Sequence, residues 1–162
     1  MTGHRMRKWD SEEVAHEQVV QFIKFQFPRI IHRTDFAAGI KLPPWLAARQ
    51  KRVQIRRGFP DIFIFEPIYA EDRWWHGLAV ELKKKGTKLK LNDGRWASDH
   101  IKEQYEMLRA LDAKGYACAF ARGFDEAEAV IRWYLERKEP IDFVDFIPTI
   151  SLGEVTDIEE AF

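Results

Sequence analysis

The sequence predicts an α/β domain in which a mixed β-sheet is flanked by helices, and three observations support this fold class. Segments with helical apolar spacing alternate along the chain with short apolar segments, an order typical of layered α/β domains. In the strand expected over residues 61–65, residues 62–65 are apolar on both faces, as expected of a central strand that is covered on both sides. A hydrophobic fraction of 46% over 162 residues is sufficient for one packed core.

The first helix is expected over residues 10–27. Asp10, followed three residues later by Glu13, fits a capping box, and a proline follows the helix. The helix has a broad apolar face, made of Val14, Phe22 and Phe25 with Val19 and Ile23 adjacent. Glu17 lies at the edge of this face, and periodicity does not distinguish it from Glu12 or Glu13.

A strand is expected over residues 29–37, and Pro44 can begin a short helix that continues to Ala48. A basic run follows this helix and consists of Arg49, Lys51, Arg52, Arg56 and Arg57. Such a run can bind a phosphate backbone, or it can be a solvated loop. Its position directly before Asp61 favours phosphate binding.

Two predicted strands carry ionisable residues that a plain hydrophobic core does not need. The first strand begins at Asp61, and a buried carboxylate costs several kcal/mol unless it is paired or bound to metal. In the second strand, residues 77–83, alternation places Glu81 and Lys83 on the same face, ~6.6 Å apart. Both side chains can therefore reach one small site.

The segment between these strands, residues 67–76, is expected to be a connecting loop. Its Trp74 and Trp75 are expected to pack beneath it, with a subunit contact or a wedge against nucleobases as alternatives. Beyond the second strand lies a second basic patch, which comprises Lys84, Lys85, Lys88 and Lys90. Like the first patch, it can bind phosphates.

The C-terminal half is expected to contain a helix over residues 98–113, a strand over 116–121 and a helix capped by Asp125. Gln104 lies within the apolar stripe of the first of these helices. A buried amide needs a hydrogen-bond partner. The partner of Gln104 can be the backbone or a neighbouring polar site. Cys118, in the strand, is interpreted as a small core residue.

The charge of the chain is unevenly distributed, although the net charge is zero. Seven acidic residues and no basic residue follow Lys138, so residues 1–138 have 26 basic and 19 acidic side chains. A net charge of +7 on this part suits a polyanionic partner such as DNA. We expect residues 1–138 to form one domain and residues 139–162 to form an acidic tail that packs on it or extends it.

The chain is expected to be cytoplasmic and not bound to membranes. Its one cysteine cannot form an internal disulfide, and the N-terminus lacks the apolar segment of a signal peptide. No apolar run reaches the ~18 residues that a transmembrane helix requires.

Two carboxylates beside a lysine suit the hydrolysis of phosphodiester bonds. Hard oxygen ligands favour Mg²⁺ or Mn²⁺, and such an ion polarises a phosphate and activates water. The sequence has no cluster of His and Cys with zinc-ligand spacing, no Gly-rich phosphate loop and no nucleophile elbow. Asp61, Glu81 and Lys83 are therefore candidate residues of a metal-dependent nuclease site.

Six short segments between about residue 16 and residue 135 resemble one known family. They are His16-Glu17-Gln18, Arg57-Gly58-Phe59-Pro60-Asp61, Gly77-Leu78-Ala79-Val80-Glu81-Leu82-Lys83, Glu103-Gln104, Lys114-Gly115-Tyr116 and Arg122-Gly123-Phe124-Asp125-Glu126-Ala127. In these segments the chain resembles the PD-(D/E)xK nuclease superfamily and, within it, the small stand-alone phage and bacterial members of the VRR-NUC family. Upstream, Ala38-Gly39 departs from the Asn-Gly of the family pattern.

This resemblance implies a restriction-endonuclease-like core and a homodimeric, metal-dependent endonuclease that cleaves branched DNA, including four-way (Holliday) junctions. It implies that Mg²⁺ or Mn²⁺ is bound by Glu17, Asp61, Glu81 and the carbonyl group of Leu82. It also implies that Lys83 is the catalytic lysine and that Gln104 contacts the site. The alternatives are a sequence-specific restriction-type endonuclease and a DNA-binding module whose catalysis is weak or lost.

Overall fold

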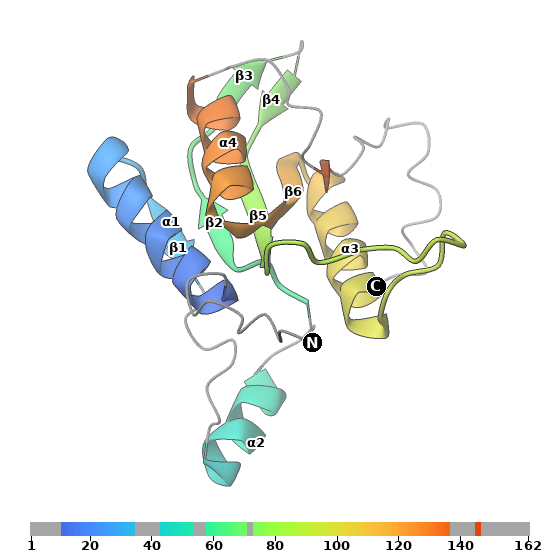
Figure 1. The fold of residues 1–162 in the computed structure, drawn as a ribbon. Coiled ribbons are helices and arrows are strands. Elements are labelled where there is room, and N and C mark those ends of the chain that lie inside the picture. The colour runs from blue at the N-terminus through green and yellow to red at the C-terminus, as the bar shows by residue number, and fades with distance from the viewer. Residues whose placement is uncertain (1–10, 35–42, 54–57, 71–72, 137–144, 147–162) are drawn as a thin grey trace, which may run out of the picture.

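The computed structural model describes residues 11–34, 43–53, 58–70, 73–136 and 145–146. Within them, a five-stranded sheet has the strand order β1-β2-β5-β6-β7. These strands are β1 (His32–Thr34), β2 (Ile62–Ile64), β5 (Gly77–Lys83), β6 (Tyr116–Arg122) and β7 (Asp145–Phe146). β5 and β6 are parallel, and the other neighbouring strands are antiparallel. The predicted fold class, a mixed sheet flanked by helices, is therefore confirmed (Figure 1).

Helices cover both faces of the sheet. α1 (Glu12–Gln26) and α4 (Gly123–Glu136) contact each other and cover one face, and α3 (Asp99–Asp112) covers β5 and β6 on the other. α2 (Pro44–Val53) lies apart from the sheet in Figure 1. None of the helices in the described ranges is long and apolar enough to cross a membrane.

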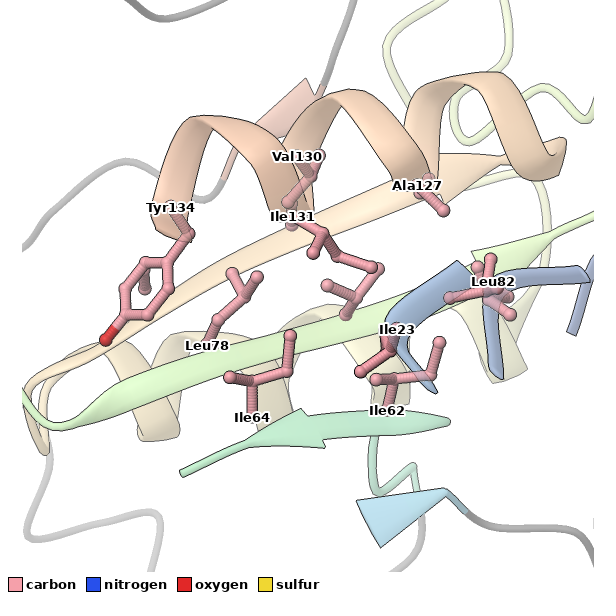
Figure 2. Close-up of a cluster of buried hydrophobic side chains, with 14 of the residues drawn as sticks. Ile23, Ile62, Ile64, Leu78, Leu82, Ala127, Val130, Ile131 and Tyr134 are labelled. Carbon is pink, nitrogen blue, oxygen red and sulfur yellow. The ribbon is translucent and has the colours of Figure 1, made fainter. Parts of the chain in front are cut away.

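The main hydrophobic core lies between the sheet and the helices α1 and α4. Figure 2 shows this cluster, in which α4 contributes Ala127, Val130, Ile131 and Tyr134, and the other layers contribute Ile23, Ile62, Ile64, Leu78 and Leu82. The Tyr134 hydroxyl donates a hydrogen bond of 2.6 Å to the carbonyl oxygen of Glu66, so the polar end of this buried ring has a partner. A smaller cluster on the other face packs beneath α3 and includes Cys118. Burial raises the pKa of the Cys118 thiol, as expected of a core residue rather than a nucleophile.

Two helices begin at different residues from those predicted. α1 is capped by Ser11 rather than by Asp10, because the Ser11 side chain accepts a hydrogen bond of 3.2 Å from the amide of Val14. α4 begins at Gly123, which places Asp125 in its first turn and not at its N-cap. Acidic residues are favourable in a first turn as well as at the cap, so composition alone leaves the starting residue ambiguous.

The buried face of α1 also differs from the prediction. Ala15, Val19 and Ile23 are buried, whereas Phe25 is 81% exposed. The small side chain of Ala15 is one helical turn from Val19, and Val19 is one turn from Ile23. This narrow stripe faces the core, because α1 has to pack closely against α4 and β5.

The predicted loop 67–76 contains a hairpin of two short strands, β3 (Ile68–Ala70) and β4 (Arg73–Trp75). Trp75 is buried, as expected of packing, and Arg73 lies over its ring, 3.6 Å from the centroid. Trp74 is exposed and contacts Tyr69 across the hairpin. Alternation within three-residue strands explains why one Trp is buried and its neighbour is not.

Three further elements differ in extent from their predictions. α2 continues to Val53 and so includes the first part of the basic run. β1 is limited to His32–Thr34, and residues 35–37 of its predicted range lie outside the described residues. Most of the predicted acidic tail also lies outside them, except that Asp145–Phe146 pairs with β6.

Candidate active site

The register between β2 and β5 brings two carboxylates together. Ile62 pairs with Val80 in this antiparallel ladder, so one further step places Asp61 beside Glu81. Asp61 is 7% exposed and Glu81 is 2% exposed. Because burying a carboxylate costs several kcal/mol without a partner, the surroundings of this pair have to compensate for the burial.

Asp61, directly before β2, is positioned by a hydrogen bond from β5 and by the packing of the preceding turn on α3. Its Oδ2 accepts a hydrogen bond of 2.8 Å from the amide of Leu82, in β5. The preceding turn contains Gly58 at φ +80°, and a Cβ there would lie 3.0 Å from the Glu103 carbonyl oxygen. Only glycine suits both this conformation and this close approach, so Gly58 allows the turn before Asp61 to pack against α3 next to Gln104.

Glu81 is bonded to two other buried polar residues through one of its oxygens. Lys83 Nζ lies 2.7 Å from Glu81 Oε1, and Gln104 Nε2 donates a hydrogen bond to the same oxygen. The other oxygen, Glu81 Oε2, and Gln104 Oε1 are buried without a hydrogen-bond partner among the described residues. The structure therefore brings together Asp61, Glu81, Lys83 and Gln104, all four of which sequence analysis singled out.

The proximity of these carboxylates changes their acidity. Burial, and next the negative charge of Asp61, raises the pKa of Glu81 to about 8. Burial also raises the pKa of Asp61, although the hydrogen bond from Leu82 and the charge of Lys83 oppose this shift. The positive charge of Lys83 is therefore not sufficient to offset the burial and mutual repulsion of the two carboxyl groups.

Two side chains of α1 act on this site through their charge, and sequence analysis did not assign either of them to it. The charge of Glu12 raises the pKa of both Asp61 and Glu81, and the charge of His16 lowers the pKa of Asp61. The Nε2 atom of His16 is buried without a hydrogen-bond partner in the described part of the chain. Glu12, which is exposed, and the half-buried His16 are one helical turn apart and lie on the same side of α1 as Val19 and Ile23. That spacing is the signal in the sequence that could have identified them.

Glu17, the carboxylate that the family resemblance implies for this helix, is exposed. It is two residues from the buried Val19, a rotation of about 200° around the helix axis. Within the described ranges, no hydrogen bond or ion pair connects Glu17 to Asp61, Glu81, Lys83 or Gln104. A role for Glu17 in metal binding stays a prediction.

The donor set is suitable for a small, hard divalent cation. Among the described residues, no group of three or more His, Cys, Asp or Glu side chains could hold a metal ion. Mg²⁺ usually takes only one or two carboxylates and keeps several waters. Asp61 and Glu81 provide that pair, and the unpartnered Oε2 of Glu81 is an available ligand atom. The residues present therefore fit Mg²⁺ or Mn²⁺ and do not resemble a zinc site.

The basic residues predicted to bind DNA are spread over several elements. Arg49 and Arg52 are exposed on α2, which also contains Lys51, whereas Arg56 and Arg57 lie outside the described residues. Beyond β5, Lys84 is half-buried and Lys88 is exposed. Lys85 is paired at 3.4 Å with Asp125, at the beginning of α4.

The raised pKa of Glu81 predicts how stability depends on pH. Between the ordinary value of 4.5 and about 8, the native state binds more protons than the unfolded chain, so the free energy of unfolding falls as pH rises. We expect a loss of ~1–3 kcal/mol between about pH 5 and about pH 8. Glu81→Gln should remove most of this slope, as measured by urea unfolding in EDTA.

Glu103→Gln is the matched control, because Glu103 is exposed on α3. It should leave the pH slope of the wild type unchanged. A slope that persists in Glu81→Gln would show that other groups cause it.

The geometry of α1 predicts which of its acids assists metal binding. We expect Glu12→Gln to weaken Mn²⁺ binding by roughly tenfold, because a nearby negative charge attracts the cation. Glu17→Gln should change the affinity by less than about twofold, because Glu12 and not Glu17 is among the charges that shift the pKa of Asp61 and Glu81. Isothermal titration of Mn²⁺ into both variants tests this, and the reverse order would assign the role to Glu17.

Comparison with known proteins finds related solved structures. The chain is similar to a solved structure described as "VRR_NUC domain protein", with 25% sequence identity over 75% of this chain and 88% of that chain, and a TM-score of 0.48. No family model matches the chain, and no curated protein does. The description of the solved structure names the family that the sequence resembles.

Proposed function

We propose that this chain is a metal-dependent DNA endonuclease that hydrolyses phosphodiester bonds in branched DNA such as four-way junctions. The observation that carries the proposal is the buried pair Asp61 and Glu81, with Lys83 and Gln104 bonded to a single oxygen of Glu81. A buried acidic pair of this kind destabilises the protein on its own. Its presence is explained if the pair binds a cation and a phosphate group during function.

Mg²⁺ or Mn²⁺ would be held by the carboxylates of Asp61 and Glu81, and the carbonyl group of Leu82 is a further candidate ligand. When bound, such an ion supplies positive charge that polarises the scissile phosphate and activates water. Asp61 is oriented for this role by the hydrogen bond that it accepts from the amide of Leu82. Its carboxylate is therefore fixed before any ligand arrives.

Lys83 and Gln104 would act on the phosphate and on the attacking water. The ammonium group of Lys83 can stabilise negative charge that develops on the phosphate oxygens, because it is already held beside Glu81. The unpartnered Oε1 of Gln104 can accept a hydrogen bond from water and so orient it. Both groups belong to regular elements, which fixes their positions more firmly than a loop would.

DNA binding would use the exposed basic residues near the site. Arg49, Arg52 and Lys88 are exposed, and such side chains bind phosphates without reading sequence. The preference for branched DNA and the homodimer follow from the resemblance to the VRR-NUC family. Two active sites in one dimer could cut both strands of a junction.

Cleavage assays with defined DNA substrates test the function directly. We expect the wild type with Mg²⁺ or Mn²⁺ to cleave four-way junctions faster than flaps, duplex or single strands. Asp61→Asn should lower the cleavage rate by at least ~10³-fold because it removes a metal ligand, while DNA binding persists. Retained cleavage by the purified variant would refute this site.

The same assay distinguishes the alternatives. Cleavage of plasmid DNA at one short sequence would identify a restriction-type enzyme. Binding without cleavage in either metal would identify a DNA-binding module. Light scattering of the free protein tests the homodimer, and a monomeric mass would contradict it.

The role of α2 is tested by the salt dependence of DNA binding. Arg49→Ala with Arg52→Ala should reduce the slope of log affinity against log salt by about 2, because each phosphate contact contributes about one unit. Lys24→Ala with Arg29→Ala is the control, because it removes the same charge from two exposed positions, one in the last turn of α1 and one just after this helix. Equal slopes for the two double variants would contradict a role for α2.

A further inference from the structure

Three phenylalanines, which we call the aromatic row, lie beside the candidate active site. They are Phe59, Phe63 and Phe65, on either side of Asp61 in the sequence. The ring centroids of Phe59 and Phe63 are 6.4 Å apart, and the rings of Phe63 and Phe65 are stacked at 6.0 Å. Phe59 is 48% exposed and Phe65 is 43% exposed. Apolar rings therefore face solvent directly beside two buried carboxylates.

The uneven coverage of the sheet explains this exposure. Ile62 and Ile64 point into the main core, so the intervening Phe63 points to the α3 face. On that face, α3 packs on β5 and β6. Phe63 is half-buried against this layer and meets the ring of Tyr116 edge to face. Phe63 thus contacts both outer rings of the aromatic row, and the outer rings are partly exposed to solvent.

A positive charge lies next to the aromatic row. Arg33 of β1 is directly opposite Phe63 in the antiparallel ladder, so their side chains share one face of the sheet. Arg33 is exposed. The surface therefore combines flat aromatic rings with a guanidinium group, and Asp61 of the candidate phosphodiester site is two residues from both Phe59 and Phe63 in the chain.

We propose that the aromatic row is a binding site for unpaired nucleobases of the DNA strand whose phosphate occupies the candidate active site. This inference rests on the proposed function. Base stacking on aromatic side chains is tolerant of sequence, and a cationic groove beside the rings follows the strand backbone. Arg33 matches the charge of such a backbone, whereas a purely apolar partner would leave its charge unpaired.

The site gives the enzyme a specific requirement for unstacked DNA. Bases in continuous duplex are paired and stacked, so they cannot reach the rings without an unstacking cost of a few kcal/mol. Nucleotides at a branch, a flap or a single-stranded end are free of much of that cost. Stacking on Phe59 and Phe65 would therefore favour substrates with unpaired nucleotides next to the cleaved bond.

The test compares two labelled oligonucleotides of the same length, one with bases and one in which abasic residues replace them. Affinity of the full-length protein is measured by fluorescence anisotropy in EDTA, so that no metal-dependent cleavage occurs. We expect Phe59→Ala and Phe65→Ala each to weaken binding of the base-containing strand by roughly tenfold, and binding of the abasic strand by less than about twofold. Phe59→Trp should retain the wild-type preference.

Phe25→Ala is the matched control, because Phe25 is an exposed phenylalanine on α1. It should bind both strands like the wild type. The proposal is overturned if Phe59→Ala and Phe65→Ala leave the base-containing strand unaffected, or weaken both strands equally. It is also overturned if these variants lower the molar mass in light scattering without changing the preference for bases, which would assign the row to a second copy of the chain.

Failure of this inference is distinguishable from failure of the proposed function. If the wild type cleaves DNA through Asp61 but the phenylalanine variants keep the preference for bases, only the stacking site is refuted. If the wild type neither binds nor cleaves DNA in the substrate assay, the proposed function itself is refuted. Because both outer rings are about half exposed and neither belongs to the two hydrophobic clusters, their truncation leaves the buried core unchanged.

Discussion

The burial of two carboxylates on neighbouring strands is the constraint on which the rest of this structure depends. Backbone pairing of β2 with β5 places Asp61 beside Glu81, and their mutual repulsion is strongest where water is excluded. The Leu82 amide, Lys83 and Gln104 each offset part of this cost. The offset is incomplete, because the pKa of both carboxyl groups stays raised. A divalent cation is the ligand that would complete it.

The larger hydrophobic core lies on one face of the sheet, and the candidate site lies on the other. One face supplies a continuous apolar core beneath α1 and α4, where Tyr134 satisfies its one polar group with a backbone carbonyl. The other face supports a smaller core beneath α3 and carries Glu81 and Lys83 at the end of β5. A large core on one face makes it possible to tolerate buried charge on the other, since the net stability of a domain is small.

The incomplete coverage by α3 connects the site to the surface. α3 reaches the site through Gln104 and through its contact with Gly58, but it packs mainly on β5 and β6. The part of the sheet around Phe63 and Phe65 is therefore open on this face. An open edge next to a candidate catalytic group is compatible with the long polymeric substrate of the proposed function, because the flanking residues of such a substrate cannot enter a closed pocket.

The sequence by itself determined the features that arise from local patterns. Alternation in β5 put Glu81 and Lys83 on one face, and the apolar stripe of α3 put Gln104 at a buried position, because these periodicities do not depend on distant contacts. Only the tertiary structure decided which side of α1 faces the site. Its apolar face was too broad to distinguish Glu12 from Glu17. Packing of α1 against α4 and β5 sets a helix orientation in which the charge of the exposed Glu12 and that of the half-buried His16 act on Asp61. The open aromatic row likewise depends on where α3 ends on the sheet, which follows from side-chain packing between distant segments and not from any local spacing.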